Sequence, residues 1–294
     1  MKYTVLTLFP EIIDAYFSNS IMAKAIQRGI ISYRSVNIRD FAYDKHKTCD
    51  DAPYGGGPGM LMLPEPLSRA LESAGVKKKN ITTELHGVTR SFEYDNHLTS
   101  VSSVPSVVKK SSCTTPGEKR VIYLSPSGRP FDQALAKDLA GERELVLLCG
   151  RYEGIDQRVI DMYIDDEVSV GDYVLSSGEV AALALIDATY RLVDRVITPE
   201  SLDEESFSGG LLEYPQYTRP EIFDTIKVPE VLLSGHHENI RKWRLEKRIE
   251  KTLRFRPDLI EKGRELGLFD KETNSVIDRQ VPAEGDKDER DKGH

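Results

Sequence analysis

Two near-continuous apolar stretches, RVIYLS at residues 120–125 and ELVLLC at residues 144–149, decide the fold class. Strands with this composition are buried on both faces, which is typical of a parallel sheet covered by helices on either side. The segment between them, FDQALAKDLA at 131–140, has helical patterning. A strand, a helix and a second strand in this order predict an α/β fold.

The patterning on both sides of these stretches extends the same arrangement. KYTVLTLF at 2–9 and ISYRSVNI at 31–38 predict two further strands. LPEPLSRALESAG at 63–75 and GEVAALALIDATYRLV at 178–193 predict helices. We therefore expect one α/β domain over residues 1–197 with a parallel sheet.

Other segments depart from this patterning. Residues 77–118 are rich in Ser, Thr and Lys and predict a disordered insertion. Residues 198–213 hold five acids and no base and predict an interdomain linker, and residues 265–294 predict a disordered tail. Between the last two, residues 214–264 predict a small helical domain.

Composition and charge exclude some classes of protein. The formal net charge is −8, but most of the acidic excess lies in residues 200–213 and 265–294. The rest of the chain is near neutral, so the total does not exclude a nucleic-acid partner. No apolar run approaches the ~20 residues of a membrane helix, and three cysteines are too few for a disulfide framework or a zinc site. We expect a cytoplasmic protein without a membrane partner.

A basic helix is predicted over residues 236–257. Its apolar stripe holds Leu245, Ile249 and Leu253 at helical spacing. A second stripe is basic, and two interpretations of it stay open: a solvated face of a helical bundle, or a surface that binds RNA phosphates. The residues of the basic stripe are Arg241, Arg244, Arg248 and Lys251.

Three glycine-bearing segments predict a ligand site. They are DDAPYGGGPGM at 50–60, CGRYEGID at 149–156 and VSVGDYVLSSGE at 168–179. The second follows a strand directly, and open α/β sheets bind ligands at the carboxyl ends of their strands. An ion pair between Arg151 and Glu153 that only holds the turn is an alternative interpretation. The pattern indicates glycine loops for a nucleotide-like ligand.

Five motifs in order resemble the bacterial tRNA (guanine-N1-)-methyltransferase family, which belongs to the SPOUT class of trefoil-knotted methyltransferases. The resemblance runs from Phe9 to about residue 257, except for 77–118. The motifs are PYGGGPGM (53–60), YLSP (123–126), CGRYEGID (149–156), GDYVLSSGE (171–179) and LLEYPQYTRP (211–220).

The resemblance implies an activity, a cofactor and partners. It implies methyl transfer from S-adenosylmethionine to N1 of the guanosine at tRNA position 37, a magnesium requirement, and a homodimer whose subunits share each active site. It also implies three cofactor-binding loops: Tyr123, Leu124, Ser125 and Pro126; Gly150, Arg151, Tyr152, Glu153 and Gly154; and Val170, Gly171, Asp172, Tyr173, Val174 and Leu175, with Gly178.

The reaction requires a base for the N1 proton and a cation near O6 of the guanine. By the resemblance, Glu205 is the base and Arg191 is the cation. The family pattern has aspartate at the base position, so Asp203 or Glu204 stays open as an alternative base. Ser177 also departs from the family pattern, which has glycine there.

Two alternative functions stay open. One is another SPOUT-class RNA methyltransferase that modifies a different base or a ribose. The other is a non-catalytic RNA-binding protein of the same fold.

Overall fold

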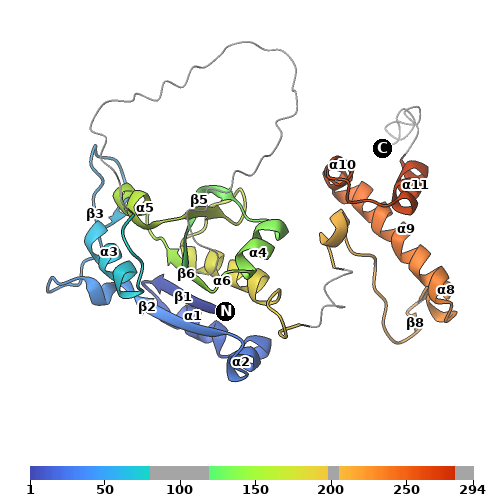
Figure 1. Cartoon of the computed structure of the whole chain (residues 1–294), viewed down its shortest axis with the longest axis horizontal. Coiled ribbons are helices and arrows are strands. Elements are labelled where there is room, and N and C mark those ends of the chain that lie inside the picture. The colour runs from blue at the N-terminus through green and yellow to red at the C-terminus, as the bar shows by residue number, and fades with distance from the viewer. Residues whose placement is uncertain (80–118, 198–204, 282–294) are drawn as a thin grey trace, which may run out of the picture. The chain divides into compact units, whose positions relative to one another are not determined.

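The computed structural model describes residues 1–79, 119–197 and 205–281 (Figure 1). These residues form two compact units, Met1–Val196 and Ile197–His294.

The first unit is built on a five-stranded parallel sheet with the strand order β2-β1-β6-β5-β7. The predicted parallel α/β sheet is therefore confirmed. Its strands are β1 (Lys2–Thr7), β2 (Ser32–Asn37), β5 (Lys119–Pro130), β6 (Glu144–Cys149) and β7 (Asp166–Ser169).

Helices cover both faces of the sheet (Figure 1), and the central strand β6 shows why. Its residues are all buried, and they alternate between two apolar clusters. Leu145 and Leu147 pack on one face with helices α1 (Pro10–Phe17), α2 (Ser20–Gln27), α4 (Gln133–Ala140) and α6 (Gly178–Tyr190). Val146 and Leu148 pack on the other face with α3 (Pro64–Ser73) and α5 (Gln157–Tyr163).

The glycine-rich segment 50–60 begins in one short strand and leads into a second. These are β3 (Asp50–Asp51) and β4 (Leu61–Met62), which pair antiparallel and follow the 3-10 helix η1 (Ile38–Phe41). This segment contacts the loop that follows β6: the Glu153 amide donates to the Met60 carbonyl (3.0 Å).

Strand β5 extends past the predicted end at residue 125. Leu124 and Arg129 both pair with Val168 of β7, so the chain between them bulges out of the ladder. Gly128 lies in this bulge, and a Cβ there would be 2.4 Å from the Val168 nitrogen. Two backbone segments therefore touch at a point where only glycine fits.

The second unit is mainly helical. Its core consists of Leu211, Ile249, Ile260, Val276 and Ile277, with Leu245 and Leu253 packed against it. Leu245, Ile249 and Leu253 do face the core as predicted. The elements are η2 (Ser208–Gly210), β8 (Ile222–Phe223), β9 (Ile226–Lys227), α8 (Glu230–Leu233), α9 (His237–Phe255), α10 (Pro257–Glu265) and α11 (Lys271–Gln280).

The predicted disordered tail is wrong for residues 265–281. Asp270 is the N-cap of helix α11, and its side chain accepts from the Thr273 amide (2.7 Å). Val276 and Ile277 bury one face of this helix against the core of the second unit. The segment is highly charged, so its two apolar residues did not predict a helix. The rest of the predicted tail, residues 282–294, lies outside the described residues.

Two other predicted boundaries also need correction. Residues 205–213 are not a bare linker, because Leu211 is 3% exposed and the Leu212 amide donates to Thr252 of α9 (2.9 Å). Residues 77–79 belong to the first unit, since the Lys79 amide donates to the Met162 carbonyl (2.9 Å). The remainder of the predicted insertion, 80–118, lies outside the described residues.

Candidate active site

A cavity of about 330 Å³ opens at the carboxyl ends of β5, β6 and β7. This is the edge at which parallel sheets bind ligands. Every residue of the three predicted cofactor loops lines the cavity except Asp172. Val168, Ser169, Ser176 and Ser177, from the predicted segment 168–179, also line the cavity. Ser127 and Ala181 line it as well and were not predicted from the sequence.

Glycines let the walls of the cavity approach each other closely. The Gly178 amide donates to the Gly150 carbonyl (2.9 Å), which joins the start of α6 to the end of β6. A Cβ on Gly178 would be 2.8 Å from the Cys149 Cα, and a Cβ on Gly150 would be 2.9 Å from the Tyr123 ring. Neither position has space for a side chain, so the cavity is walled there by backbone.

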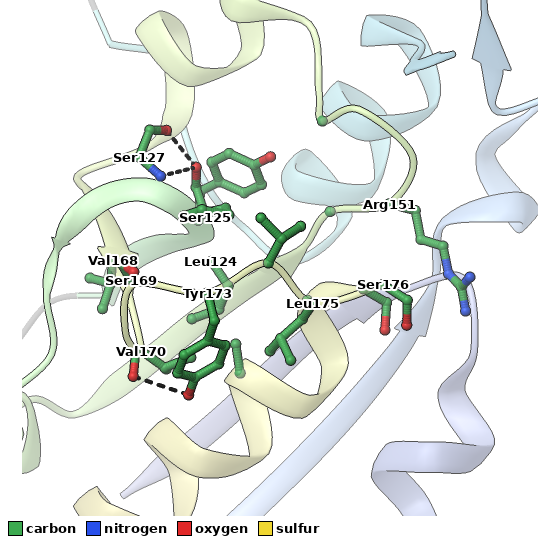
Figure 2. A pocket seen from close by; sticks show the side chains of 18 of the residues that line it. Leu124, Ser125, Ser127, Arg151, Val168, Ser169, Val170, Tyr173, Leu175 and Ser176 are labelled. Carbon is green, nitrogen blue, oxygen red and sulfur yellow. Dashed lines mark hydrogen bonds between the residues drawn. The ribbon is translucent and has the colours of Figure 1, made fainter. Parts of the chain in front are cut away.

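The third loop, after β7, is held by its own hydrogen bonds. The Ser169 hydroxyl donates to the Gly171 carbonyl (3.0 Å), and the Tyr173 hydroxyl donates to the Val170 carbonyl (3.2 Å; Figure 2). The Tyr173 ring lies against the α-carbon of Gly171, whose φ of +152° also favours glycine. Tyr173 remains 56% exposed, so an aromatic face is available beside the cavity.

The first loop, at the end of β5, contributes hydroxyl groups and a buried phenol. The Ser125 and Ser127 hydroxyls are 2.7 Å apart (Figure 2). Burial raises the pKa of Tyr123 to about 12, so this phenol stays protonated at neutral pH. The loop therefore offers neutral donors and acceptors and no charge.

Arg151 and Glu153 in the second loop contact different groups. The Arg151 guanidinium lies 4.4 Å from the centroid of the Phe9 ring. The Glu153 side chain packs over Gly59, where an added Cβ would be 2.3 Å from the Glu153 Cγ. Within residues 1–79, 119–197 and 205–281 no ion pair joins Arg151 to Glu153, so the alternative interpretation of a simple turn-holding pair is wrong.

A buried carboxylate next to the cavity was missed by sequence reasoning. Glu179 is fully buried, and its Oε1 accepts from the Thr7 hydroxyl. Its Oε2 has no hydrogen-bond partner within the described part of the chain. An acid in the first turn of a helix is usually a surface residue, so nothing in the sequence signalled its burial.

Cys149 does not have the properties of a nucleophile. It is fully buried, and burial together with the nearby Glu179 carboxylate raises the pKa of its thiol. A reactive cysteine needs a thiolate and access to the substrate. Cys149 is therefore a core residue of β6.

The two predicted catalytic residues lie in separate units. Arg191 is the C-cap of α6, which ends at Tyr190 rather than at the predicted residue 193. Glu205 is half-buried, belongs to the second unit and begins the described stretch 205–281. The alternative bases Asp203 and Glu204 lie outside the described residues. The roles of Arg191 and Glu205 therefore stay predictions.

The predicted RNA-binding stripe on α9 is partly engaged within the second unit. Arg241 forms ion pairs with Glu238 (3.0 Å) and Glu272 (2.9 Å). The Arg248 Nε donates to the Leu212 carbonyl (3.2 Å). The Arg244 guanidinium lies 4.7 Å from the Tyr214 ring centroid, and Lys251 is half-buried.

Neither a metal cluster nor a membrane span is found in the described parts of the chain. Residues 1–79, 119–197 and 205–281 contain no group of three or more His, Cys, Asp or Glu that could hold a metal ion. No helix in the same ranges has the length and apolar content needed to cross a bilayer.

Comparison with known proteins identifies the family. The family model described as tRNA (Guanine-1)-methyltransferase TrmD matches residues 1–107 and 99–262. A tRNA (guanine-N(1)-)-methyltransferase of Treponema denticola is 57% identical over 94% of this chain and 98% of its own length. The protein of the same name from Treponema pallidum is 53% identical over 94% of this chain and 95% of its own length. The one from Borreliella burgdorferi is 53% identical over 90% of this chain and 95% of its own length. The chain belongs to the tRNA (guanine-N1-)-methyltransferase family.

Proposed function

We propose that this member of the tRNA (guanine-N1-)-methyltransferase family methylates N1 of the guanosine at tRNA position 37, beside the anticodon, with S-adenosylmethionine as methyl donor. One observation carries the proposal: the three loops predicted to bind the cofactor line one cavity at the carboxyl edge of the sheet. A tRNA substrate also implies work in the cytoplasm.

Two features of the cavity support S-adenosylmethionine as its ligand. Its side at Gly150 and Gly178 carries no side chains, so a purine can lie close to the main chain there. Tyr173 and Leu175 offer apolar surface for the faces of the purine. When bound, S-adenosylmethionine supplies a methyl group that its sulfonium already activates, so the protein need not provide a covalent nucleophile.

The chain's own task is to prepare the guanine. Guanine N1 carries a proton, and the guanine must lose this proton before N1 becomes a good nucleophile. We assign the acceptance of this proton to the Glu205 carboxylate. We assign the stabilisation of the negative charge that develops at O6 to the Arg191 guanidinium.

The trefoil knot is part of the proposal. A knot requires chain to pass closely by chain, and knotted topologies are rare exceptions among folds. Two close backbone approaches support it: Gly128 against Val168, and Gly178 against Cys149. Both lie between β5 and α6, the region in which the knot is proposed.

We propose that the small second unit binds the tRNA. The cations of α9 supply the surface: Arg241, Arg244, Arg248 and Lys251. Glu238 and Glu272 offset part of the charge of Arg241. Magnesium is implied by the family, but the described residues offer no cluster for it, so no residue or step is assigned to magnesium.

A homodimer with shared sites is the last element of the proposal. Arg191 and Glu205 lie in different units, so one subunit could supply Arg191 and its partner Glu205. Mixing Arg191→Ala with Glu205→Gln protein tests this. In a symmetric dimer, random mixing gives half heterodimers, each with one intact site, so about a quarter of the wild-type activity should return. No recovery after verified subunit exchange would show that each site lies within one subunit.

One experiment tests the activity itself. Methyl transfer is measured on two tRNA transcripts that differ only in guanosine or adenosine at position 37. We expect transfer to the guanosine transcript alone, with the methyl group on N1. Transfer to both transcripts would favour another SPOUT-class methyltransferase, and absence of S-adenosylmethionine binding in calorimetry would favour a non-catalytic RNA-binding protein.

A further inference from the structure

A second large pocket lies at the opposite edge of the sheet from the cofactor cavity. Its volume is about 560 Å³, and it is lined where the strands begin, by Lys2 of β1, Lys119 of β5 and Glu144 of β6. Glu144 is the first residue of β6, and Gly150, which lines the cofactor cavity, directly follows the end of β6 six positions further along the chain. At ~3.3 Å per residue the two sites are about 20 Å apart.

The floor of this pocket holds two ammonium groups in fixed positions. The buried Glu144 carboxylate lies 3.1 Å from the Lys2 Nζ and 3.4 Å from the Lys119 Nζ. It also accepts from the Thr4 hydroxyl (2.8 Å). Lys119 is further held by a hydrogen bond to the Ala74 carbonyl. Because one carboxylate faces two lysines, the floor keeps an excess positive charge.

The rim adds three cations, Lys77, Lys79 and Arg143, and one carboxylate, Asp165. Lys79 pairs with Asp165 (3.2 Å). Lys77 and Arg143 also line the pocket, are exposed, and form no ion pair within residues 1–79, 119–197 and 205–281. In all, five cationic side chains line the pocket against two carboxylates.

This arrangement suits a ligand with several negative charges. Each phosphate group has multiple oxygens that accept hydrogen bonds from separate ammonium and guanidinium donors. The excess of cations exceeds what one singly charged group would offset. We propose that this lysine pocket, lined by Lys2, Lys77, Lys79, Lys119 and Arg143, binds phosphate groups, either successive phosphates of an RNA strand or those of a free nucleoside polyphosphate.

Of these two sources the RNA strand rests on the proposed function, whereas the free polyphosphate does not. A tRNA extends well beyond 20 Å, so one molecule could occupy the cofactor edge and the lysine pocket together. A nucleotide bound only at the lysine pocket is too far from the cofactor cavity to be the methyl acceptor.

The test removes the two rim charges that make no ion pair. The variant Lys77→Gln/Arg143→Gln leaves the lysines of the floor in place, so it should fold. The matched control is Lys24→Gln/Lys137→Gln, which removes two exposed charges from α2 and α4. Three quantities are measured on the full chain: tripolyphosphate affinity by calorimetry, the salt dependence of tRNA binding, and S-adenosylmethionine affinity.

The two sources give different results. If the pocket binds RNA, the negative slope of log K against log salt should become shallower by about 1.4–1.8 in the rim variant, since each lost phosphate contact contributes ~0.7–0.9 to its magnitude. If it binds a free polyphosphate, tripolyphosphate affinity should fall at least tenfold while the slope is unchanged. S-adenosylmethionine affinity should stay at the wild-type value in either case, which separates this proposal from the proposed function.

The proposal is overturned if neither the slope nor the tripolyphosphate affinity of the rim variant differs from wild type. It is also overturned if the control variant changes both by the same amounts, because the effect would then reflect total charge. Both sources are refuted at once if the wild-type protein binds no tripolyphosphate and the rim variant has the same salt slope as the wild type.

Discussion

Replacing Gly178 with alanine would insert one methyl group between the start of α6 and the end of β6. The new Cβ would lie 2.8 Å from the Cys149 Cα and 2.9 Å from the Gly150 nitrogen. Both neighbours are backbone atoms, so neither can rotate away as a flexible side chain would. The φ of Gly178 is outside the left-handed region, so the effect is steric and not conformational.

The size of the effect follows from these distances. Ordinary Cβ contacts begin at 3.4 Å, so the walls must separate by about 0.6 Å at the closest point. The free protein can relax this way by lengthening the hydrogen bond from the Gly178 amide to the Gly150 carbonyl. A ligand that contacts both the start of α6 and the end of β6 must then bring these two segments together again, against the steric clash. Overpacking of this kind costs about 1–3 kcal/mol, which corresponds to roughly 5- to 150-fold weaker S-adenosylmethionine binding.

Calorimetry with S-adenosylmethionine measures this loss, and thermal unfolding of the same protein shows whether the fold survives. The control is Gly141→Ala at the C-cap of α4, where an added Cβ would meet only the Asp138 carbonyl at 3.3 Å. We expect the control to bind the cofactor like wild type. Unchanged affinity in folded Gly178→Ala protein would refute the claim that backbone contact at this point shapes the cavity.

Three further predictions concern single side chains. Glu205→Gln should lower the single-turnover methylation rate by ~10²–10⁴ while Glu205→Asp keeps appreciable activity; a near-normal rate for Glu205→Gln would move the base to a neighbour. Arg248→Ala should destabilise the second unit by about 0.5–1.5 kcal/mol in urea titrations, since a hydrogen bond is lost; an unchanged midpoint would make this contact dispensable. Burial alone would raise the pKa of Glu144, but hydrogen bonds from Thr4 and Lys2 hold this pKa below the ordinary value of 4.5. The Glu144 carboxylate should therefore stabilise the fold fully above pH 4.5, and this stabilisation should be lost on further acidification. Thr4→Val should make the urea midpoint depend less on pH in this acidic range. An equal pH dependence in the variant and the wild type would contradict the role given to the Thr4 hydrogen bond.

The strands with continuous apolar runs could be predicted from sequence because burial on both faces leaves a simple signature. The predicted strand 144–149 coincides with β6, and its alternating contacts explain the apolar run. The far half of β5 could not be predicted in this way. The segment SPSGRP has no apolar period, and its pairing with β7 depends on the contact of Gly128 with Val168, which is distant in sequence.

The candidate site shows the same division. Motif resemblance located the cavity loops, whose roles follow from short contiguous segments. It could not show that Glu179 is buried against Thr7, because those residues are 172 positions apart. Likewise, the charge of Arg241 looked available in sequence, but Glu272 of α11 offsets it from a segment that was expected to be disordered.

The central position of β6 has a consequence for how the molecule opens. Because β6 contributes alternate side chains to both apolar clusters, neither cluster can come apart without exposing the strand that serves the other. Amide hydrogens of β6 should therefore exchange with solvent only through global unfolding. The second loop continues directly from this strand, whereas the third loop follows β7 at the sheet edge. We expect exchange to be faster there, so that a ligand can enter past the third loop while the wall formed by β6 stays closed.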